Sequence, residues 1–264
     1  MFALLKSLWA YRGFVASSIR NEFAARFARS RLGGLWMIIH PLAQVAIYAL
    51  ILSNVLAARL PGIDNRYAYA QYLMAGILAW TLFAEIVSRC LGLFIEQGAL
   101  MKKMRFPRIT LPVIVVGSSL LNNLFLLLAL VLVFALLGRP PHLLLAWLLP
   151  LTFACLVLAL GIGLILGILN VFMRDVGQVV PIILQMWFWF TPIIYPLNVI
   201  PEAFRGLLAL NPMFPIVAAY QDVLVYGRMP DAIALLWVTM AGLALMAVGL
   251  FMFRRAAPEM VDAL

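Results

Sequence analysis

The sequence predicts an all-α membrane protein with six transmembrane helices in a single domain over residues 1–264. Of its residues, 66% are hydrophobic and only 11% are charged, whereas about a quarter of the residues in a soluble domain are charged. The apolar residues form blocks of about 20 residues or more, the length that crosses a bilayer. The net charge of +9 comes from short segments between these blocks, so it indicates membrane topology rather than nucleic-acid binding.

Six apolar blocks are long enough to span the membrane. They are Leu35–Ala58, Tyr72–Ile95, Leu111–Leu137, Leu143–Phe172, Val176–Leu197 and Ala232–Phe253. The segments on the side of the two termini, including the tail 254–264, hold 13 Lys and Arg residues, and the opposite loops hold five. Because cytoplasmic segments carry the excess of basic residues, we expect both termini to lie in the cytoplasm.

Residues 1–34 predict an amphipathic helix that lies in the cytoplasmic interface. Val15, Ile19, Phe23 and Phe27 recur every four residues, which places them on one stripe of a helix. Six basic residues and the lack of a compact apolar core indicate that this segment is not a signal peptide. A solvated basic leader is the alternative interpretation.

A sharp turn is expected between this helix and the first span. The pair Gly33–Gly34 permits the turn, and Trp36 follows at the depth where amphipathic rings favour the interface. The pair His40–Pro41 is expected in the first turn of the span, where proline is tolerated. A metal site is not expected, because the only other histidine, His142, falls on the far side of the membrane.

The second span carries an ionisable pair, Glu85 and Arg89. They stand four residues apart, so they can pair on one helical face. An ionisable residue at membrane depth is also a candidate for transport. Structural pairing and a functional role both remain open from the sequence.

The small residues of the apolar blocks predict packing rather than chemistry. Cys90 and Cys155 lie inside apolar runs, which indicates buried small hydrophobic residues rather than a disulfide or a zinc site. Gly163 and Gly167 form a GxxxG spacing that lets helices approach closely. We expect this spacing to serve packing inside one subunit.

The loop Gln97–Pro112 is short, basic and cytoplasmic. A small helix is expected from Ala99 to Arg105, and Phe106 before Pro107 offers an exposed apolar side chain. The residues available for docking a partner are Met101, Lys102, Lys103, Met104, Arg105, Phe106 and Arg108. A topology signal and a docking helix are equally compatible with this pattern.

The stretch Arg174–Pro201 joins a charged pair to an aromatic block and a proline-broken apolar segment. Asp175 is expected to cap the fifth span, next to Arg174 at a cytoplasmic junction. Prolines free backbone carbonyls, which inside a membrane need partners in protein or in a water-filled cavity. The outer loop 198–231 is expected to hold short re-entrant or interfacial helices, within Glu202–Leu210 and Pro215–Leu224, or to be a structured loop without a gating role.

Several catalytic motifs are missing from the sequence. None of the three lysines is preceded by the glycines of a phosphate-binding P-loop, and there is no HExxH or GxSxG motif. We therefore expect a chain that does not hydrolyse ATP through a P-loop and binds no cofactor of its own. An ion-coupled secondary carrier is the rival from another class, and Glu85 is its one candidate for a buried titratable group.

Five segments in order resemble a known family. The N-terminal basic helix comes first, and four segments follow it: RSRLGGLWMIIHPL, LMKKMRFPRITLP, NVFMRDVGQVVP and FWFTPIIYPLNVIP. Together they resemble the ABC-2 type permeases that export polysaccharide, especially the O-antigen exporters of Gram-negative bacteria. The resemblance implies a type V exporter fold, a homodimer in the bacterial inner membrane, and two copies of a cytoplasmic ATPase subunit that bind the ATP and Mg. It also implies that residues 99–108 form a coupling helix.

The resemblance further implies a substrate, an undecaprenyl-diphosphate-linked polysaccharide that enters from the cytoplasmic interface amid membrane lipids. Capsule and teichoic acid export remain alternatives within the family. The residues suited to the diphosphate are Arg26, Arg29, Arg31 and Trp36, and those suited to a polymer channel are Trp187, Phe188, Trp189, Phe190, Tyr195 and Tyr48. An interfacial aromatic belt is the alternative use of the aromatic residues, since four consecutive side chains on a helix cannot all face one channel.

Overall fold

The computed structural model describes residues 9–27, 32–51, 65, 67–103, 107–138, 143–197, 206, 208 and 210–263. Within these ranges the chain is all-helical, with turns between helices and no strand. The elements are α2 (Arg12–Phe27), η1 (Gly33–Leu35), α3 (Trp36–Leu50), α4 (Ala68–Glu96), α5 (Gly98–Lys103), α6 (Thr110–Leu136), η3 (Leu143–Trp147), α7 (Leu148–Phe172), α8 (Val176–Trp189), α10 (Met213–Gln221), η5 (Asp222–Tyr226) and α11 (Ala232–Ala263).

Four of the described helices are long and apolar enough to cross a membrane: α4, α6, the segment Leu144–Phe172 and the segment Ala232–Ala256. They match the expected second, third, fourth and sixth spans within a few residues. The expected first span is only partly described, as α3, because 52–58 lie outside the described residues. The expected fifth span, which prolines interrupt, is described in part as α8. This helix ends at Trp189, before Pro192, which cannot donate a backbone hydrogen bond.

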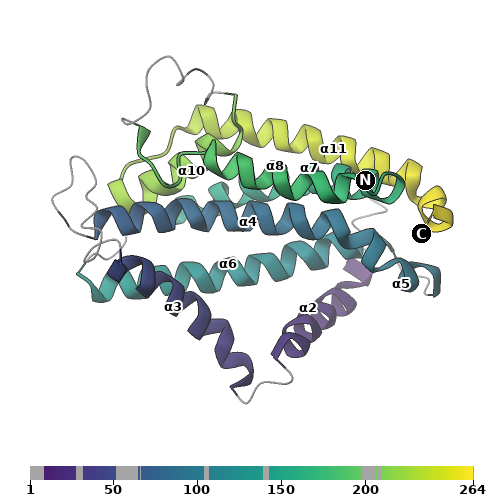
Figure 1. Ribbon diagram of the computed structural model, residues 1–264, viewed down its shortest axis with the longest axis horizontal. Helices are drawn as coiled ribbons and strands as arrows, with labels where there is room; N and C mark the ends of the chain where they lie inside the picture. Colours follow the sequence, from purple (N-terminus) through teal and green to yellow (C-terminus); the bar gives the residue numbers. More distant parts are fainter. Residues whose placement is uncertain are drawn as a thin grey trace.

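Helix α4 lies at the centre of the bundle (Figure 1). Twenty of its 29 residues are buried, because α6 covers one side and α7, α8 and α10 cover the other. A helix that is apolar on all sides is buried on all sides. The polar residues that interrupt α4 are therefore held at fixed places by its neighbours.

Glycines allow the close packing of α4 against α7. A Cβ added to Gly167 would lie 2.3 Å from the carbonyl oxygen of Cys90, and one added to Gly163 would lie 2.8 Å from the Cβ of Cys90. This confirms that the GxxxG spacing serves packing inside one subunit. Both Cys90 and Cys155 are free and buried, as small hydrophobic residues would be.

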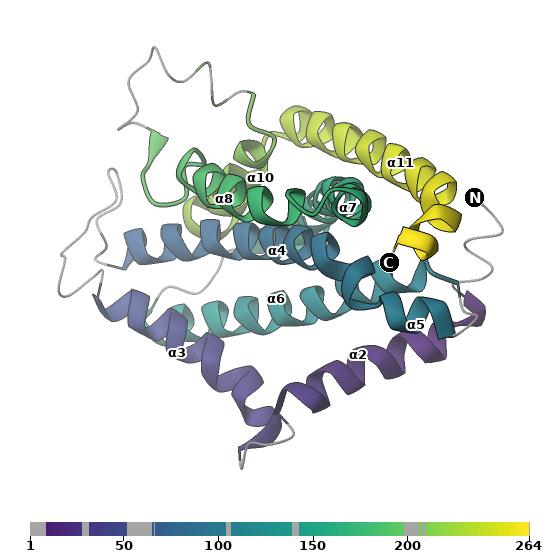
Figure 2. The same cartoon turned by 45° about the vertical axis from the view of Figure 1, so that its right-hand side comes forward.

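The helices α2 and α3 form a V on the side of α6 (Figures 1 and 2). Between them the structure describes a turn at Leu32 and the 3₁₀ turn η1, which contains the glycine pair at which a turn is expected, while residues 28–31 lie outside the described part. The apolar stripe of α2 faces inward, since Phe23 is buried while Ser17 and Asn21 are exposed. The expectation for Pro41 is wrong, because α3 begins at Trp36 and places the proline in its interior.

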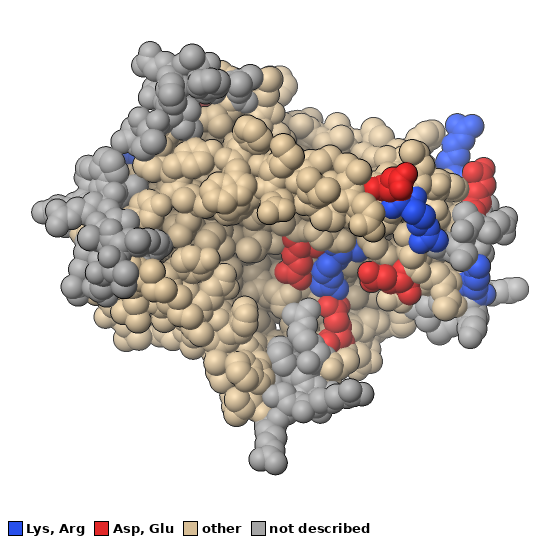
Figure 3. Space-filling model, in the orientation of Figure 1, with Lys and Arg blue, Asp and Glu red and all other residues tan. Residues whose placement is uncertain are grey.

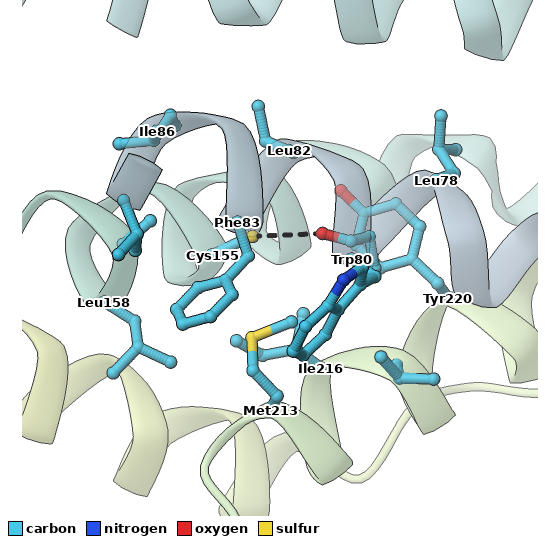
Figure 4. Close-up of a cluster of buried hydrophobic side chains, with 14 of the residues drawn as sticks. Leu78, Trp80, Leu82, Phe83, Ile86, Cys155, Leu158, Met213, Ile216 and Tyr220 are labelled. Carbon is cyan, nitrogen blue, oxygen red and sulfur yellow. Dashed lines mark hydrogen bonds between the residues drawn. The ribbon is translucent and has the colours of Figure 1, made fainter. Parts of the chain in front are cut away.

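The helix α10 packs into the bundle core rather than over its surface. Met213 and Ile216 lie beside the α4 residues Trp80 and Phe83 (Figure 4), and the hydroxyl of buried Tyr220 bonds Thr152 of α7 at 2.8 Å. The π-helical turn η5 continues α10 and ends at Gly227, whose φ of 61° is the left-handed conformation common at helix ends. A short helix over Pro215–Leu224 is thus confirmed, whereas most of Glu202–Leu210 lies outside the described residues.

The C-terminal tail is an extension of a helix. The expected last span ends at Phe253, but α11 continues to Ala263, and Met260 near its end is buried. Helix α11 contacts α7 along the bundle and also α5. The tail and the basic loop therefore meet at one end of the molecule (Figure 2).

Candidate functional site

Arg89 of α4 is the centre of a polar cluster in the apolar bundle. Its Nη2 lies 2.8 Å from both carboxylate oxygens of Glu22 in α2. Its Nη1 donates to the hydroxyl of Ser118 in α6 at 2.7 Å and lies 3.4 Å from the Oε1 of Glu85. The contact between Glu85 and Arg89, which the sequence led us to expect, is thus the longest of these contacts. Through its shorter contacts the guanidinium of Arg89 joins α4 to α2 and α6.

Helix α6 supplies the polar side chains that meet α4. The Nδ2 of Asn122 donates to the Oε1 of Glu85 at 2.8 Å. Ser118 precedes Asn122 by one helical turn, so both lie on one face of α6. On a neighbouring stripe, Asn123 donates to the carbonyl of Leu78 at 2.8 Å and holds the two helices in register.

A cavity of about 640 Å³ lies between α3, α4 and α6 on the Glu85 side of this cluster. It is lined by Trp36, Met37, His40, Pro41, Gln44, Thr81, Leu82, Glu85, Asn122, Asn123, Phe125 and Leu126. We call it the α3 cavity. Glu85 and Asn122 stand near the middle of their long helices, so the polar part of the cavity lies near the middle of the bundle.

A second cavity of about 690 Å³ lies on the Arg89 side, between α2, α4 and α6. Its charged lining residues are Glu22, Arg89 and Glu96. On the face shown in Figure 3, acidic and basic side chains gather near the middle among uncharged residues, and the surface is hollowed beside them. The ion pairs thus form the wall between two openings.

The segment after α8 is held against α4 by its backbone carbonyls. The hydroxyl of Tyr72 donates to the carbonyls of Pro192 and Tyr195, each at 3.2 Å, and Gln221 donates to the carbonyl of Pro192 at 3.1 Å. The hydroxyl of Tyr69 donates to the carbonyl of Ile194 at 2.6 Å. The carbonyls at the broken helix are therefore satisfied within the protein, as an apolar environment requires.

The expected polymer-contacting aromatic residues are divided between interior and surface. Trp187 packs against Trp80 and Phe83, with ring centroids 6.3 and 5.1 Å apart, and half-buried Phe188 also lies against Trp80. Trp189 and Phe190 are exposed by 58% and 66%. The two remaining candidates are half-buried: Tyr195, which donates to the carbonyl of Trp189 at 2.6 Å, and Tyr48, which packs against the core.

A single amide joins α8 to α10. Asn211 accepts from the indole N–H of Trp187 at 2.7 Å and from the backbone N–H of Met213 at 3.0 Å. Its Nδ2 donates to the carbonyl of Phe190 at 3.2 Å and to the hydroxyl of Thr191 at 2.9 Å. All four hydrogen-bonding positions of this side chain are therefore used.

Helix α5, which carries Met101 and Lys102 of the expected docking residues, lies at the opposite end of the bundle from α10 (Figure 1). Helix α5 buries Met101 in the core and exposes Lys102, and Arg108 is half-buried. The side chain of Lys103 and residues Met104, Arg105 and Phe106 lie outside the described part of the chain. A docking role for this loop stays a prediction.

Two further sets of expected residues are only partly described. Arg29, Arg31 and the side chain of Arg26 lie outside the described residues, and Trp36 is 39% exposed beside the α3 cavity. Arg174 and Asp175 are exposed in the turn between α7 and α8. Asp175 occupies the N-cap position of α8, but its side chain makes no capping hydrogen bond, so the capping interpretation is wrong.

Sequence reasoning missed Glu22, Gln44, Ser118 and Asn122 as parts of the site. The available signal was the run Ser118–Asn123, which places two Ser and two Asn residues inside an otherwise apolar span. Polar residues at i and i+4 in such a span mark a face that does not contact lipid. The partners of that face could not be read from the run itself.

Comparison with known proteins gives a consistent result. A family model described as ABC-2 type transporter matches residues 15–225. The chain is 30% identical over 271 residues, covering 100% of both chains, to the O-antigen export system permease protein RfbA of Myxococcus xanthus. It is 29% identical over 237 residues to the RfbA of Klebsiella pneumoniae, covering 89% of this chain and 88% of the relative. It is 26% identical over 253 residues to the polysialic acid transport protein KpsM of Escherichia coli, covering 92% and 93%.

Proposed function

Because the chain belongs to the ABC-2 type transporter family, we propose that it is the transmembrane subunit of an exporter of lipid-linked polysaccharide, with O-antigen as the first candidate. The full-length likeness to an O-antigen export permease carries this proposal. The chain is a multi-pass membrane protein of this transporter family, and we place it in the bacterial inner membrane with both termini in the cytoplasm.

The physical task explains why an apolar bundle needs polar openings. A sugar chain cannot cross about 30 Å of hydrocarbon unaided, because each desolvated hydroxyl costs on the order of one to several kcal/mol. A hydrated path removes that cost. The cavities on both sides of Arg89, with amide and carboxylate side chains at mid-bundle depth, are suited to such a path.

The helix α10 with η5 is a candidate re-entrant element. Asn211 at its start bonds the end of α8, and the carbonyl of Leu224 near its end accepts from Gln71, in the first turn of α4, at 2.8 Å. Its 14 residues span roughly 21 Å, which is shorter than the hydrocarbon layer. We propose that α10 enters the membrane from the outer side and narrows the exit.

Energy for export comes from a partner subunit in this proposal. The chain has no P-loop, so ATP and Mg bind to a separate ATPase, of which two copies serve a homodimer of this chain. Helix α5 is the proposed coupling helix, since its buried Met101 anchors it to the bundle while Lys102 is exposed. ATP-driven movement of the partner would shift α5 and favour one of two states of the bundle.

The experiment is reconstitution of the chain with its ATPase partner in vesicles that contain lipid-linked polysaccharide. ATP-dependent transfer of the polymer across the membrane is the expected result, and a partner with an inactive ATPase site is the control. Transfer driven by an ion gradient without ATP would instead support the rival secondary carrier. Phe106→Asp is expected to abolish export while membrane insertion is unchanged, and normal export by this variant would refute the docking role of residues 97–112.

Capsule export is the second candidate within the family, and the likeness to the polysialic acid transport protein favours it over teichoic acid. Replacing the O-antigen-type substrate in the same vesicles by polysialic acid tests it directly. Preferential transfer of the polyanionic chain would make capsule export the function.

A further inference from the structure

We propose that the α3 cavity is a sugar-binding site that takes uncharged, hydroxyl-rich units and selects against polyanionic chains, an inference that rests on the proposed export of polysaccharide. Glu85 and Gln44 supply the recognising groups, and they come from α4 and α3. The third wall of the cavity is α6, whose Asn122 holds the Glu85 carboxylate at 2.8 Å. The site is therefore formed within a single subunit.

The side chains of the cavity keep hydrogen-bonding capacity toward its interior. Both protein contacts of Glu85 fall on Oε1, so Oε2 accepts no hydrogen bond from a described residue. Within the described part of the chain, the half-buried side chain of Gln44, which also lines the cavity, makes no hydrogen bond to another residue. A carboxylate oxygen and an amide at mid-bundle depth need water or a polar ligand as partner.

The backbone of α3 adds another acceptor. Pro41 stands inside the helix and has no N–H, so the carbonyl of Met37 lacks its usual partner four residues on. Both residues line the cavity. The proline therefore leaves a polar backbone group without a helical partner in a helix that lines the cavity, two turns before Gln44.

These groups match the chemistry of a sugar. Each hydroxyl of a sugar both donates and accepts, so it can donate to the Glu85 carboxylate or the Met37 carbonyl and accept from an amide N–H. The apolar part of the lining, Leu82, Phe125 and Leu126, can contact the C–H faces of the ring. The volume of about 640 Å³ lies within the roughly 300–1,000 Å³ of small-molecule sites.

The charge of the lining gives the selectivity. Glu85 is the one charged residue among the described residues that line the α3 cavity, and no Lys or Arg joins it there. Arg89 is turned toward Glu22, at 2.8 Å, more closely than toward Glu85, at 3.4 Å. A phosphate or a carboxylate in the cavity would therefore meet a negative wall without a cation to bind it.

The test measures binding of two oligosaccharides of equal length to the purified permease–ATPase complex in nanodiscs, by saturation-transfer NMR. One probe is a neutral mannose oligosaccharide and the other is oligosialic acid. We expect the wild type to bind the neutral probe and to bind the anionic probe about tenfold more weakly or worse. Gln44→Leu is expected to weaken neutral binding by about fivefold, as for one lost hydrogen bond, whereas Gln185→Leu, an exposed amide on α8, is expected to leave binding unchanged.

Glu85→Gln tests the selectivity, because it keeps the shape of the side chain and removes the charge. We expect the preference for the neutral probe to shrink at least about tenfold in this variant, with thermal unfolding in detergent as the check that it folds. Equal binding of both probes by the wild type, or equal binding by the Gln44 and Gln185 variants, would overturn the proposal. If one of these binding results is found but the complex still exports polysaccharide with ATP, only the sugar-site proposal fails and the proposed function stands. If the wild-type complex exports no polysaccharide, the proposed function itself is refuted.

Discussion

Gly167→Ala probes the closest approach between α4 and α7. The added Cβ would lie 2.3 Å from the carbonyl oxygen of Cys90, whereas a relaxed C···O contact is at least about 3.3 Å. The two backbones must therefore separate by about 1 Å. No rotamer change relieves the clash, because the atom that is met belongs to the backbone of α4.

The expected cost of this change is about 2 kcal/mol, the middle of the range for overpacking a core. For a chain of this size, that loss lowers the midpoint of thermal unfolding by roughly 4–8 °C. The assay is thermal unfolding of the purified protein in one detergent at one scan rate, so that the midpoints of all variants are compared under the same conditions. Gly13→Ala is the matched control, because nothing lies within 4 Å of its added Cβ, and it should not lower the midpoint.

A double-mutant cycle makes the test sharper. The Cβ added at Gly163 would meet the Cβ of Cys90 at 2.8 Å, so Cys90→Gly should relieve Gly163→Ala but not Gly167→Ala. We expect a favourable coupling energy of about 1 kcal/mol for the first pair and additive effects for the second. An unchanged midpoint for Gly167→Ala, or equal rescue of both variants, would refute the close α4–α7 packing.

Three further changes test other contacts of the structure. Glu22→Gln and Arg89→Gln should show a coupling energy of about 1–2 kcal/mol by thermal unfolding, because their short ion pair is about one quarter exposed; additive single effects would contradict the pairing. Asn211→Leu should cost about 2–4 kcal/mol, since four hydrogen bonds are lost, and a midpoint like that of the wild type would show that α8 and α10 are held otherwise. Asp175→Ala should change stability by less than about 0.5 kcal/mol, and a loss near the ~1 kcal/mol of a removed N-cap would restore the capping interpretation.

The long helices were predictable because their signals are local. An apolar run long enough to cross the bilayer predicts a helix over the same residues. Helices α4, α6 and α7 accordingly begin and end within a few residues of their expected bounds. The stripe of α2 and the glycine spacing of α7 are also local, since their periods depend only on helix geometry. These parts of the fold follow from residues a few positions apart.

The polar cluster was only half predictable for the opposite reason. Spacing four residues apart indicated that Glu85 could reach Arg89, but the shorter bonds of Arg89 go to residues 67 and 29 positions away. Such pairings depend on how helices pack, which a one-dimensional pattern does not contain. The same holds for the partners of Asn211.

The expectations for Asp175 as a helix cap and for Pro41 in a first helical turn were wrong because the surroundings of each residue changed its role. The backbone N–H groups at the start of α8 already have carbonyl partners, since Gly177 donates to Arg174 and Gln178 to Asp175, so the carboxylate of Asp175 has no capping role. Pro41 is tolerated inside α3 because the cavity beside it leaves room for an unpaired carbonyl. In both cases, the exception marks a surface that faces an opening or solvent.

Three of the four bonds of Asn211 have a mechanical consequence. They reach Trp187, Phe190 and Thr191 and so fix the end of α8 to the start of α10, which makes the two helices move as one unit. Helix α8 is about 21 Å long, and a tilt of about 10° at its exposed Arg174 end would displace its other end by about 4 Å. A displacement of a few ångströms at the Arg174 end of α8 would thereby move the start of α10 by a similar distance, without any change in the hydrogen bonds between the two helices.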